Sequence, residues 1–208
     1  MISALFTLLA YLLGSVSFAV VISRVFGLPD PRSYGSGNPG ATNVLRSGSK
    51  LAAALTLLGD LLKGAVAVWV TQALGPRLGP GDGTIALVAV AAFAGHLYPV
   101  FFRFKGGKGV ATAAGILLAL SPSLGLAALA VFAAVIAASR FVSLASVSAA
   151  LAAAIAAPLL LGWGPIALAV LLMAALVVWR HRQNLQRLLA GQEGRLGARK
   201  PVPPPEQA

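Results

Sequence analysis

Seven long apolar stretches divide this sequence, and they constrain its fold more than any other feature. They cover residues 2–25, 51–74, 84–102, 110–120, 124–138, 141–161 and 165–179. Most approach the ~20 residues that an α-helix needs to cross the ~30 Å hydrocarbon core of a bilayer. Only 10% of the residues are charged, whereas a soluble domain carries about 25%. The sequence therefore predicts an all-α polytopic membrane protein with seven transmembrane helices.

Two of these stretches admit a different arrangement. The fourth and fifth are short, and only Ser121, Pro122 and Ser123 separate them. They could form two inclined spans or one re-entrant pair, and we expect two spans. The first stretch has no basic segment before it and has Arg24 at its end, so we expect a retained span rather than a cleaved signal peptide.

Basic residues collect on one side of the predicted bundle. Fourteen of the sixteen Lys and Arg residues lie in or beside residues 26–50, 103–109, the turn at Arg140 and the tail from Arg180. Cytoplasmic loops carry such an excess, so we expect the N-terminus outside and the C-terminus in the cytoplasm, in the cell's cytoplasmic (inner) membrane. We expect residues 1–197 to form one domain and the proline-rich residues 198–208 to form a disordered cytoplasmic tail.

The composition excludes several kinds of site. The chain has no cysteine, which excludes disulfides, thiolate metal sites and a cysteine nucleophile. Its five acidic residues are scattered, so we expect no metal and no other cofactor. The net charge of +11 can reflect topology or attraction of an anionic substrate, and topology explains most of it. We expect no nucleic-acid partner.

The loop between the first two stretches, GSGNPGATNVLR, is rich in hydrogen-bond donors. Its glycines free backbone N–H groups, and its terminal arginine is a forked cation suited to phosphate. It contains G-x-G-x-x-G, but it follows a membrane span and no βαβ unit surrounds it, so an anion-binding nest is the better interpretation. The alternative is an ordinary flexible loop. The candidate residues are Gly35, Ser36, Gly37, Asn38, Gly40, Thr42, Asn43 and Arg46.

A second motif, RFKGGKGVAT, directly precedes the fourth stretch. Glycines at a helix start leave N–H groups free where the helix dipole also attracts anions. It is not a Walker A motif, because Gly109 follows Lys108 where Ser or Thr is required. The alternative is a basic cytoplasmic loop with a helix start. The candidate residues are Lys105, Gly106, Gly107, Lys108, Gly109 and Thr112.

The third motif is the run RHRQNLQRLLAGQE that begins at Arg180. At helical spacing Arg180, Asn184 and Arg187 share one face, and His181 lies beside it. The alternative is a basic helix resting on anionic lipid. Neither His181 nor His96 has an acidic residue four or five positions on, so neither forms the His-x4-Asp dyad of the common glycerolipid acyltransferases.

A fourth feature is the pair Asp60 and Lys63 inside the second stretch. Ionisable groups within a membrane are costly, and they are usually paired or functional. A structural ion pair that braces the bundle is an equally weighted interpretation.

Taken in order, these blocks resemble the bacterial family of membrane acyl-phosphate:glycerol-3-phosphate acyltransferases, the PlsY family. The resemblance runs from about residue 11 to residue 193 and also includes YLLGS, GD-x-x-KG and GHLYPVF. Three long motifs in the same order are specific, whereas any one alone is not. Two departures are small: Ser17 stands where the family is expected to carry proline, and Pro39 occupies a variable position.

The resemblance implies transfer of a fatty acyl group from acyl phosphate to the 1-hydroxyl of glycerol 3-phosphate. The products are 1-acyl-glycerol 3-phosphate and inorganic phosphate, in phospholipid biosynthesis, with no cofactor and no covalent acyl-enzyme. The implied active-site residues are Ser36, Arg46, Lys108, His181 and Asn184, with Arg180 binding substrate. Lys105 is an alternative to Lys108, and the implied supporting residues are Asp60, Lys63, His96 and Glu193.

In that chemistry, Asn184 or backbone N–H groups would stabilise the oxyanion, and Lys108 would stabilise the departing phosphate. The base is either His181 or an oxygen of the substrate phosphate. The expected partners are both substrates, membrane lipid and a soluble enzyme that produces acyl phosphate. The active site is expected on the cytoplasmic side, where the polar motifs gather.

Two other functions compete with this one. A transporter of a phosphorylated solute would also need a polytopic fold and anion-binding loops, and the intramembrane pair Asp60 and Lys63 would suit it. Transporters, however, usually have inverted repeats and a substrate site near the midplane, and we find no internal repeat. A non-catalytic scaffold would leave the glycine-rich loops unexplained.

Overall fold

The computed structural model describes residues 1–79 and 81–197, and these residues form helices joined by loops, without a β-strand. The predicted tail, residues 198–208, lies outside the described residues. The α-helices are α1 (Ile2–Gly14), α2 (Phe18–Val25), α3 (Ala41–Val44), α4 (Lys50–Leu78), α5 (Asp82–Leu97), α6 (Val110–Leu120), α7 (Pro122–Ser139), α8 (Val142–Leu161), α9 (Pro165–Arg180) and α10 (Arg182–Leu189). Two 3₁₀ helices, η1 (Leu45–Ser47) and η2 (Val100–Phe102), complete the described part.

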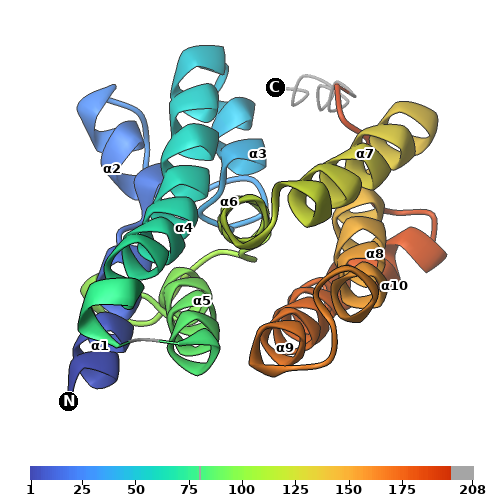
Figure 1. Cartoon of the computed structure of the whole chain (residues 1–208). Coiled ribbons are helices and arrows are strands. Elements are labelled where there is room, and N and C mark those ends of the chain that lie inside the picture. Colours follow the sequence, from blue (N-terminus) through green and yellow to red (C-terminus); the bar gives the residue numbers. More distant parts are fainter. Residues whose placement is uncertain (80, 198–208) are drawn as a thin grey trace, which may run out of the picture.

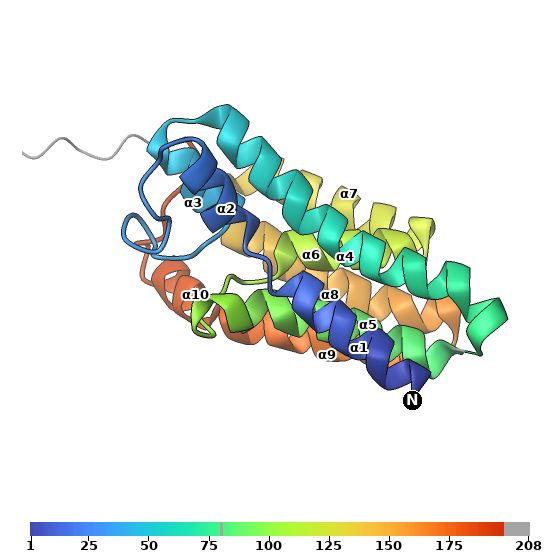
Figure 2. The same ribbon diagram turned by 90° about the vertical axis from the view of Figure 1, so that its left-hand side faces the viewer.

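The long helices form two groups with α6 between them (Figure 1). In one group α1 packs on α5 and α2 packs on α4; in the other, α8 packs between α7 and α9. Helix α6 packs on both α4 and α7, and α5 also contacts α9, so the two groups form one bundle. The short helices α2, α3 and α10 gather at one end of this bundle, away from the N-terminus (Figure 2).

Glycines hold two helix pairs in close contact. A side chain on Gly14 of α1 would overlap the Ala92 carbonyl of α5, and one on Gly95 of α5 would overlap the Tyr11 carbonyl of α1. The α4–α6 pair has the same reciprocal design, with Gly64 against Thr112 and Gly115 against Leu61. Small residues let backbones approach in membranes, where no hydrophobic force drives helices together. The apolar stretches therefore associate through glycine contacts.

The helices confirm that the chain is a membrane protein, but they do not confirm the predicted number of seven spans. Among the described residues, four helices are long and apolar enough to cross a membrane, or up to six if each of two bent pairs counts as one span. Helix α6, predicted as a full span, has 11 residues and is therefore about 16 Å long. It lies at the centre of the bundle, where its neighbours cover it (Figure 1).

The first apolar stretch, predicted as one helix over residues 2–25, is broken. Helix α1 ends at Gly14, α2 begins at Phe18, and the two are bent by 43°. The Ser15 hydroxyl donates to the Tyr11 carbonyl, and Lys63 of α4 donates to the freed Val16 carbonyl at 2.7 Å. Side chains thus donate hydrogen bonds to backbone carbonyls for which lipid offers no donor. The break in the helix is tolerated for this reason.

The C-terminal motif, predicted as one helical run from Arg180, is also broken. Helix α9 ends at Arg180, α10 begins at Arg182, and the bend at His181 is 52°. The His181 ring donates from Nδ1 to the Val177 carbonyl at 2.8 Å, which satisfies an acceptor at the helix end. Arg180 and Asn184 therefore belong to different helices and not to one helical face.

The glycine contacts give a direct test of helix packing. Gly115→Val should lower the midpoint of thermal unfolding in detergent, because the new side chain would overlap the Leu61 carbonyl; overpacking costs about 1–3 kcal/mol. Gly83→Ala in α5 is the matched control, since a side chain there meets open space, and it should leave the midpoint unchanged or slightly raised. Equal midpoints for Gly115→Val and the parent protein would contradict the packing described.

Candidate active site

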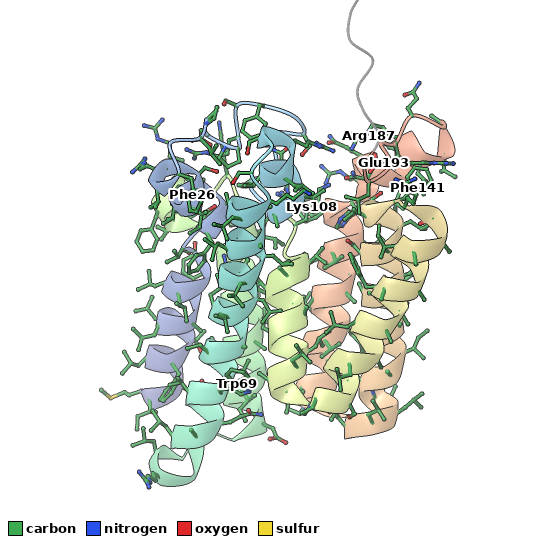
Figure 3. All side chains as sticks on the ribbon, turned by 90° about the horizontal axis from the view of Figure 1, so that it is seen from above. Phe26, Trp69, Lys108, Phe141, Arg187 and Glu193 are labelled. Atoms are coloured by element: carbon green, nitrogen blue, oxygen red, sulfur yellow. The ribbon has the colours of Figure 1, made fainter. Side chains whose placement is uncertain are left out.

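The candidate site lies at the end of the bundle where the loops and short helices gather. Figure 3 shows Lys108, Arg187 and Glu193 there, whereas Trp69 lies in the other half of the bundle. Three segments distant in sequence meet at this end: the loop before α3, the loop before α6, and the segment around α10. These are the three motifs that the sequence singled out.

The first loop is folded around Asn43. The Asn43 side chain is buried; its Oδ1 accepts from the Ser36 backbone N–H at 3.0 Å and from Arg46 at 3.2 Å, and its amide donates to the Pro31 carbonyl at 2.6 Å. Gly35 and Gly37 have left-handed φ values of 61° and 66°, as a nest-like turn requires. Asn43 is therefore occupied within the loop, and Ser36 and Arg46 are left exposed at its surface.

The second loop descends onto the end of α5. The Gly107 N–H donates to the His96 carbonyl at 3.1 Å, and a side chain on Gly106 or Gly107 would overlap His96. Arg180 donates to the carbonyls of Gly106 and Gly107 at 2.9 Å and 2.8 Å. Of the glycines in this loop, Gly109 is the one with a left-handed φ, 83°, and it caps α6. The Gly106–Gly107 pair thus serves close approach to α5 and α9.

Lys108 joins the second motif to the third. Its half-buried ammonium donates to the Asn184 side-chain carbonyl. The Asn184 amide donates to Glu193 at 2.6 Å, and Arg187 donates to the same carboxylate at 3.0 Å. Burial alone would raise the pKa of Glu193, but the hydrogen bonds from Asn184 and Arg187 outweigh it and lower that pKa. The charged carboxylate fixes the Asn184 amide so that its oxygen faces Lys108.

The electrostatics around Lys108 favour an anionic ligand. Burial lowers the pKa of Lys108 to about 8; attraction to Glu193 opposes this shift, and repulsion from Arg187, Arg180 and Arg46 adds to it. The ammonium is therefore partly desolvated and lies among three arginines, and a phosphate group would stabilise its charge. The contribution of Arg46 also shows that the first loop lies within electrostatic reach of Lys108.

His181 lies beside this cluster in the neutral form. Burial lowers its pKa to about 4, the hydrogen bond to Val177 opposes the shift, and the charges of Lys108 and Arg180 strengthen it. Because Nδ1 carries the proton that Val177 accepts, Nε2 carries a free lone pair at neutral pH. With a pKa of about 4 His181 is a weak base, but this lone pair can accept a hydrogen bond from a substrate hydroxyl.

An apolar cavity begins directly below the polar cluster. It opens outward on one side and has a volume of about 60 Å³. Its walls come from α6, α7, α8 and α9, and they are Val110, Ala113, Ala114, Leu117, Ala128, Leu129, Phe132, Ser146, Ala149, Ala150 and Val177. Val110 follows Lys108 by two residues, and Val177 is the hydrogen-bond partner of His181. A ligand with a charged head and an apolar tail fits this junction.

The other predicted residues lie at different depths. Lys105 is exposed, and its side chain makes no hydrogen bond or ion pair with another described residue. Thr112 is fully buried, with its hydroxyl 3.1 Å from His96 Nδ1. Asp60 and Lys63 form a buried ion pair at 2.8 Å beneath the loops. Asn38, Gly40 and Thr42 belong to the first loop, where Thr42 is exposed.

Sequence reasoning did not place two of the contacting residues in the site. Arg187 was assigned to the face of Arg180 and Asn184, but its contact with Glu193 depends on the chain folding back after α10. Pro39, treated as a variable position, places its carbonyl against Gly107, 3.0 Å from where a Cβ would stand. The helical spacing of Arg187 was a signal, whereas nothing in the sequence indicated the Pro39 contact.

Comparison with known proteins identifies the family of this chain. A family model described as glycerol-3-phosphate acyltransferase matches residues 4–191. A glycerol-3-phosphate acyltransferase of Ralstonia nicotianae is 60% identical over 198 residues, which cover 95% of this chain and 96% of the relative. One of Thiobacillus denitrificans is 58% identical over 199 residues, which cover 96% of this chain and 100% of the relative.

Two solved structures share the fold. The crystal structure of PlsY (YgiH), an integral membrane glycerol 3-phosphate acyltransferase, in its glycerol 3-phosphate form has a TM-score of 0.88 and 38% identity. The lysophosphatidic acid form has a TM-score of 0.86 and 37% identity, and both comparisons cover 95% of this chain and 96% of the other. The chain belongs to the glycerol-3-phosphate acyltransferase family and has the integral-membrane fold of PlsY.

Proposed function

We propose that this protein transfers a fatty acyl group from acyl phosphate to the 1-hydroxyl of glycerol 3-phosphate, giving lysophosphatidic acid and inorganic phosphate. Family membership supports acylation of glycerol 3-phosphate, and with it a role in phospholipid biosynthesis. The acyl-phosphate donor is the one that the resemblance to the PlsY family implies, and the junction between Lys108 and the apolar cavity supports it.

That junction is the observation that carries the proposal. Lys108 and Arg180 lie two and three residues along the chain from the wall residues Val110 and Val177, and the cavity is lined mainly by aliphatic and aromatic side chains. An acyl phosphate has its dianionic group directly on the acyl carbonyl, so its head would lie at Lys108 and its chain would extend past Val110. A coenzyme A thioester would instead place a long polar arm at this point.

The reaction requires positioning and charge more than a nucleophile. The 1-hydroxyl oxygen attacks the acyl carbonyl carbon, and the bond from that carbon to the phosphate oxygen breaks. Phosphate leaves with both electrons of that bond, and the hydroxyl proton passes to His181 Nε2 or to a phosphate oxygen. Lys108 neutralises the charge of the leaving phosphate, and a preorganised cation of this kind contributes strongly in a water-poor site.

The first loop completes the polar wall of the site. Ser36 and Arg46 are exposed on it, and the charge of Arg46 helps to lower the pKa of Lys108. We assign Ser36 and Arg46 to the phosphate of glycerol 3-phosphate, because a guanidinium fork and a hydroxyl suit its oxygens. Lys108 is preferred to Lys105, since Lys108 is half-buried and bonded to Asn184.

We further propose seven passes through the membrane, with the N-terminus outside and the C-terminus in the cytoplasm. The four long helices, the two bent pairs and the short α6 correspond one to one with the seven apolar stretches. The basic residues at the loop end support a cytoplasmic site in the inner membrane. A soluble enzyme that produces acyl phosphate could then deliver the donor from the cytoplasm.

Reconstitution in vesicles tests the function against solute transport. With acyl phosphate and glycerol 3-phosphate, the purified protein should release phosphate and form lysophosphatidic acid in equal amounts. Asp60 and Lys63 pair with each other inside the bundle, so we expect no accumulation of glycerol 3-phosphate within vesicles. Accumulation without turnover would favour a transporter, and turnover with acyl-CoA alone would exclude our donor.

The two lysines of the second loop should differ in their effect. Lys108→Ala should lower kcat/KM by at least ~100-fold, the usual effect of removing one preorganised charge-stabilising group. Lys105→Ala, an exposed lysine of the same loop, is the matched control and should stay within a few-fold of the parent. The reverse order of effects would move the site to Lys105.

The charge on Lys108 predicts how the rate depends on pH. Its pKa is about 8, so the ammonium is present below that pH and is lost above it. Because kcat/KM reports the free enzyme, it should fall as the pH rises through about 8. Lys108→Arg keeps its charge, so this fall should move to higher pH, whatever the absolute rate. A pH profile that is identical in both proteins would contradict the assignment.

The apolar cavity predicts acyl-chain selectivity. Ala150→Phe fills the cavity wall on α8 and should lower kcat/KM for long-chain acyl phosphates by about 10-fold, with a smaller effect on short chains. Ile155→Phe on the exposed side of the same helix is the control and should leave chain preference unchanged. A uniform loss across chain lengths would show that the chain lies elsewhere.

A further inference from the structure

We infer that His96 is a positioning residue for Lys108, acting through the Gly107 backbone, and that Asp60, Lys63 and Thr112 hold the His96 ring for this role. The inference rests on the proposed function, because it presumes that Lys108 handles phosphate. This role explains the presence of buried polar groups that do not take part in the acyl transfer itself.

These groups form one connected network below the loops. Asp60, Lys63 and Thr112 are each at most 2% exposed, and His96 is 8% exposed. Asp60 Oδ1 lies 2.8 Å from Lys63 Nζ and 3.6 Å from His96 Nδ1, without an aligned hydrogen bond from any described donor. The Thr112 hydroxyl lies 3.1 Å from the same ring nitrogen. One edge of the imidazole is thus held by α4 and α6.

The opposite edge of the imidazole supports the second loop. His96 Nε2 lies against Gly107 so closely that any side chain on Gly107 would overlap it. The His96 carbonyl accepts from the Gly107 N–H at 3.1 Å, which fixes the loop a second time. Lys108 is the next residue along the chain.

Gly107 is where the three motifs meet. Its carbonyl accepts from Arg180 at 2.8 Å, and the carbonyl of Pro39 from the first loop lies against it. A shift of this glycine would therefore move Lys108 relative to Arg180 and the first loop together. Displacements of about 1 Å are enough to lower rates by about 100-fold.

A purely structural role explains the network less well. Ion pairs buried in low dielectric stabilise a fold no better, as a rule, than well-packed apolar residues of similar volume. Burying charged groups is costly, and these groups lie directly beneath a functional loop. Their presence is better explained by the position in which they hold that loop. Their position at the base of the loop, remote from the outer half of the bundle that Trp69 marks, fits that explanation.

A double-mutant cycle separates positioning from bracing. His96→Ala and Gly107→Ala should each lower kcat/KM by about 10-fold or more, the second because its methyl group would overlap the imidazole. In the double variant the imidazole is absent, so the added methyl group should cost little beyond His96→Ala alone. His96→Gln, whose terminal amide can reach the position of Nε2, should recover most of the activity.

The fall of kcat/KM at high pH, its alkaline limb, gives an independent readout of the state of Lys108. The charged or titratable groups facing Lys108 are Glu193, Arg187, Arg180, Arg46 and His181. A loop released from His96 exposes Lys108 to water, so in His96→Ala the fall should move from about 8 toward 10.5. Val68→Ala, a buried change in α4 next to Trp69, should lower thermal stability without moving this limb.

All variants are compared as folded protein, by thermal unfolding in detergent. Losses that multiply in the double variant, together with an unmoved alkaline limb in His96→Ala, would overturn the positioning role. If His96→Ala does not fold, Gly107→Ala decides the question, because an unmoved limb and an unchanged rate in that variant would overturn the role. Retention of full activity by Lys108→Ala would instead overturn the proposed function, whatever the His96 variants do.

Discussion

The contact between the Lys108 ammonium and the Asn184 side chain is the interaction on which the rest of the site depends. It joins the loop before α6 to the helix after α9, and Glu193 fixes it from the far side through the Asn184 amide. The same lysine lies two residues before Val110 of the cavity wall, and the charge of Arg46 helps to lower its pKa. Lys108 therefore connects the polar cluster with the apolar cavity. A lipid-like substrate with a phosphate head suits that arrangement.

The membrane determines which parts of the chain are apolar helices and which are polar loops. Helices satisfy their own backbone groups in lipid, so the apolar part of the bundle can be built from closely packed helices such as the α1–α5 and α4–α6 pairs. Loops with free donors belong at the surface, where water and charged substrates arrive. A site at this boundary can hold an acyl chain among helices and two phosphates at the loop end. Acyl phosphate already carries a good leaving group, so charge and orientation can replace a covalent nucleophile.

Much of this arrangement was predictable, and the failures have physical causes. Apolar length predicted where each long helix lies, because spanning a bilayer demands it. The break at Val16 was not predictable, since it depends on Lys63 reaching across from another helix. Gly106 and Gly107 were interpreted as glycines that free N–H groups at a helix start, whereas in the structure they allow close approach to His96. Both roles require the absence of a Cβ, so the sequence alone cannot separate them. Arg187 and Glu193 meet only because the chain folds back.

The central claim is direct transfer between two substrates held together at Lys108, and a single-turnover experiment tests it most directly. Purified protein in lipid is mixed with acyl phosphate labelled in the acyl chain, first without and then with glycerol 3-phosphate. The account predicts that no label remains on the denatured protein and that phosphate is released only when glycerol 3-phosphate is present. A stoichiometric burst of phosphate with acylated protein, before glycerol 3-phosphate is added, would contradict it.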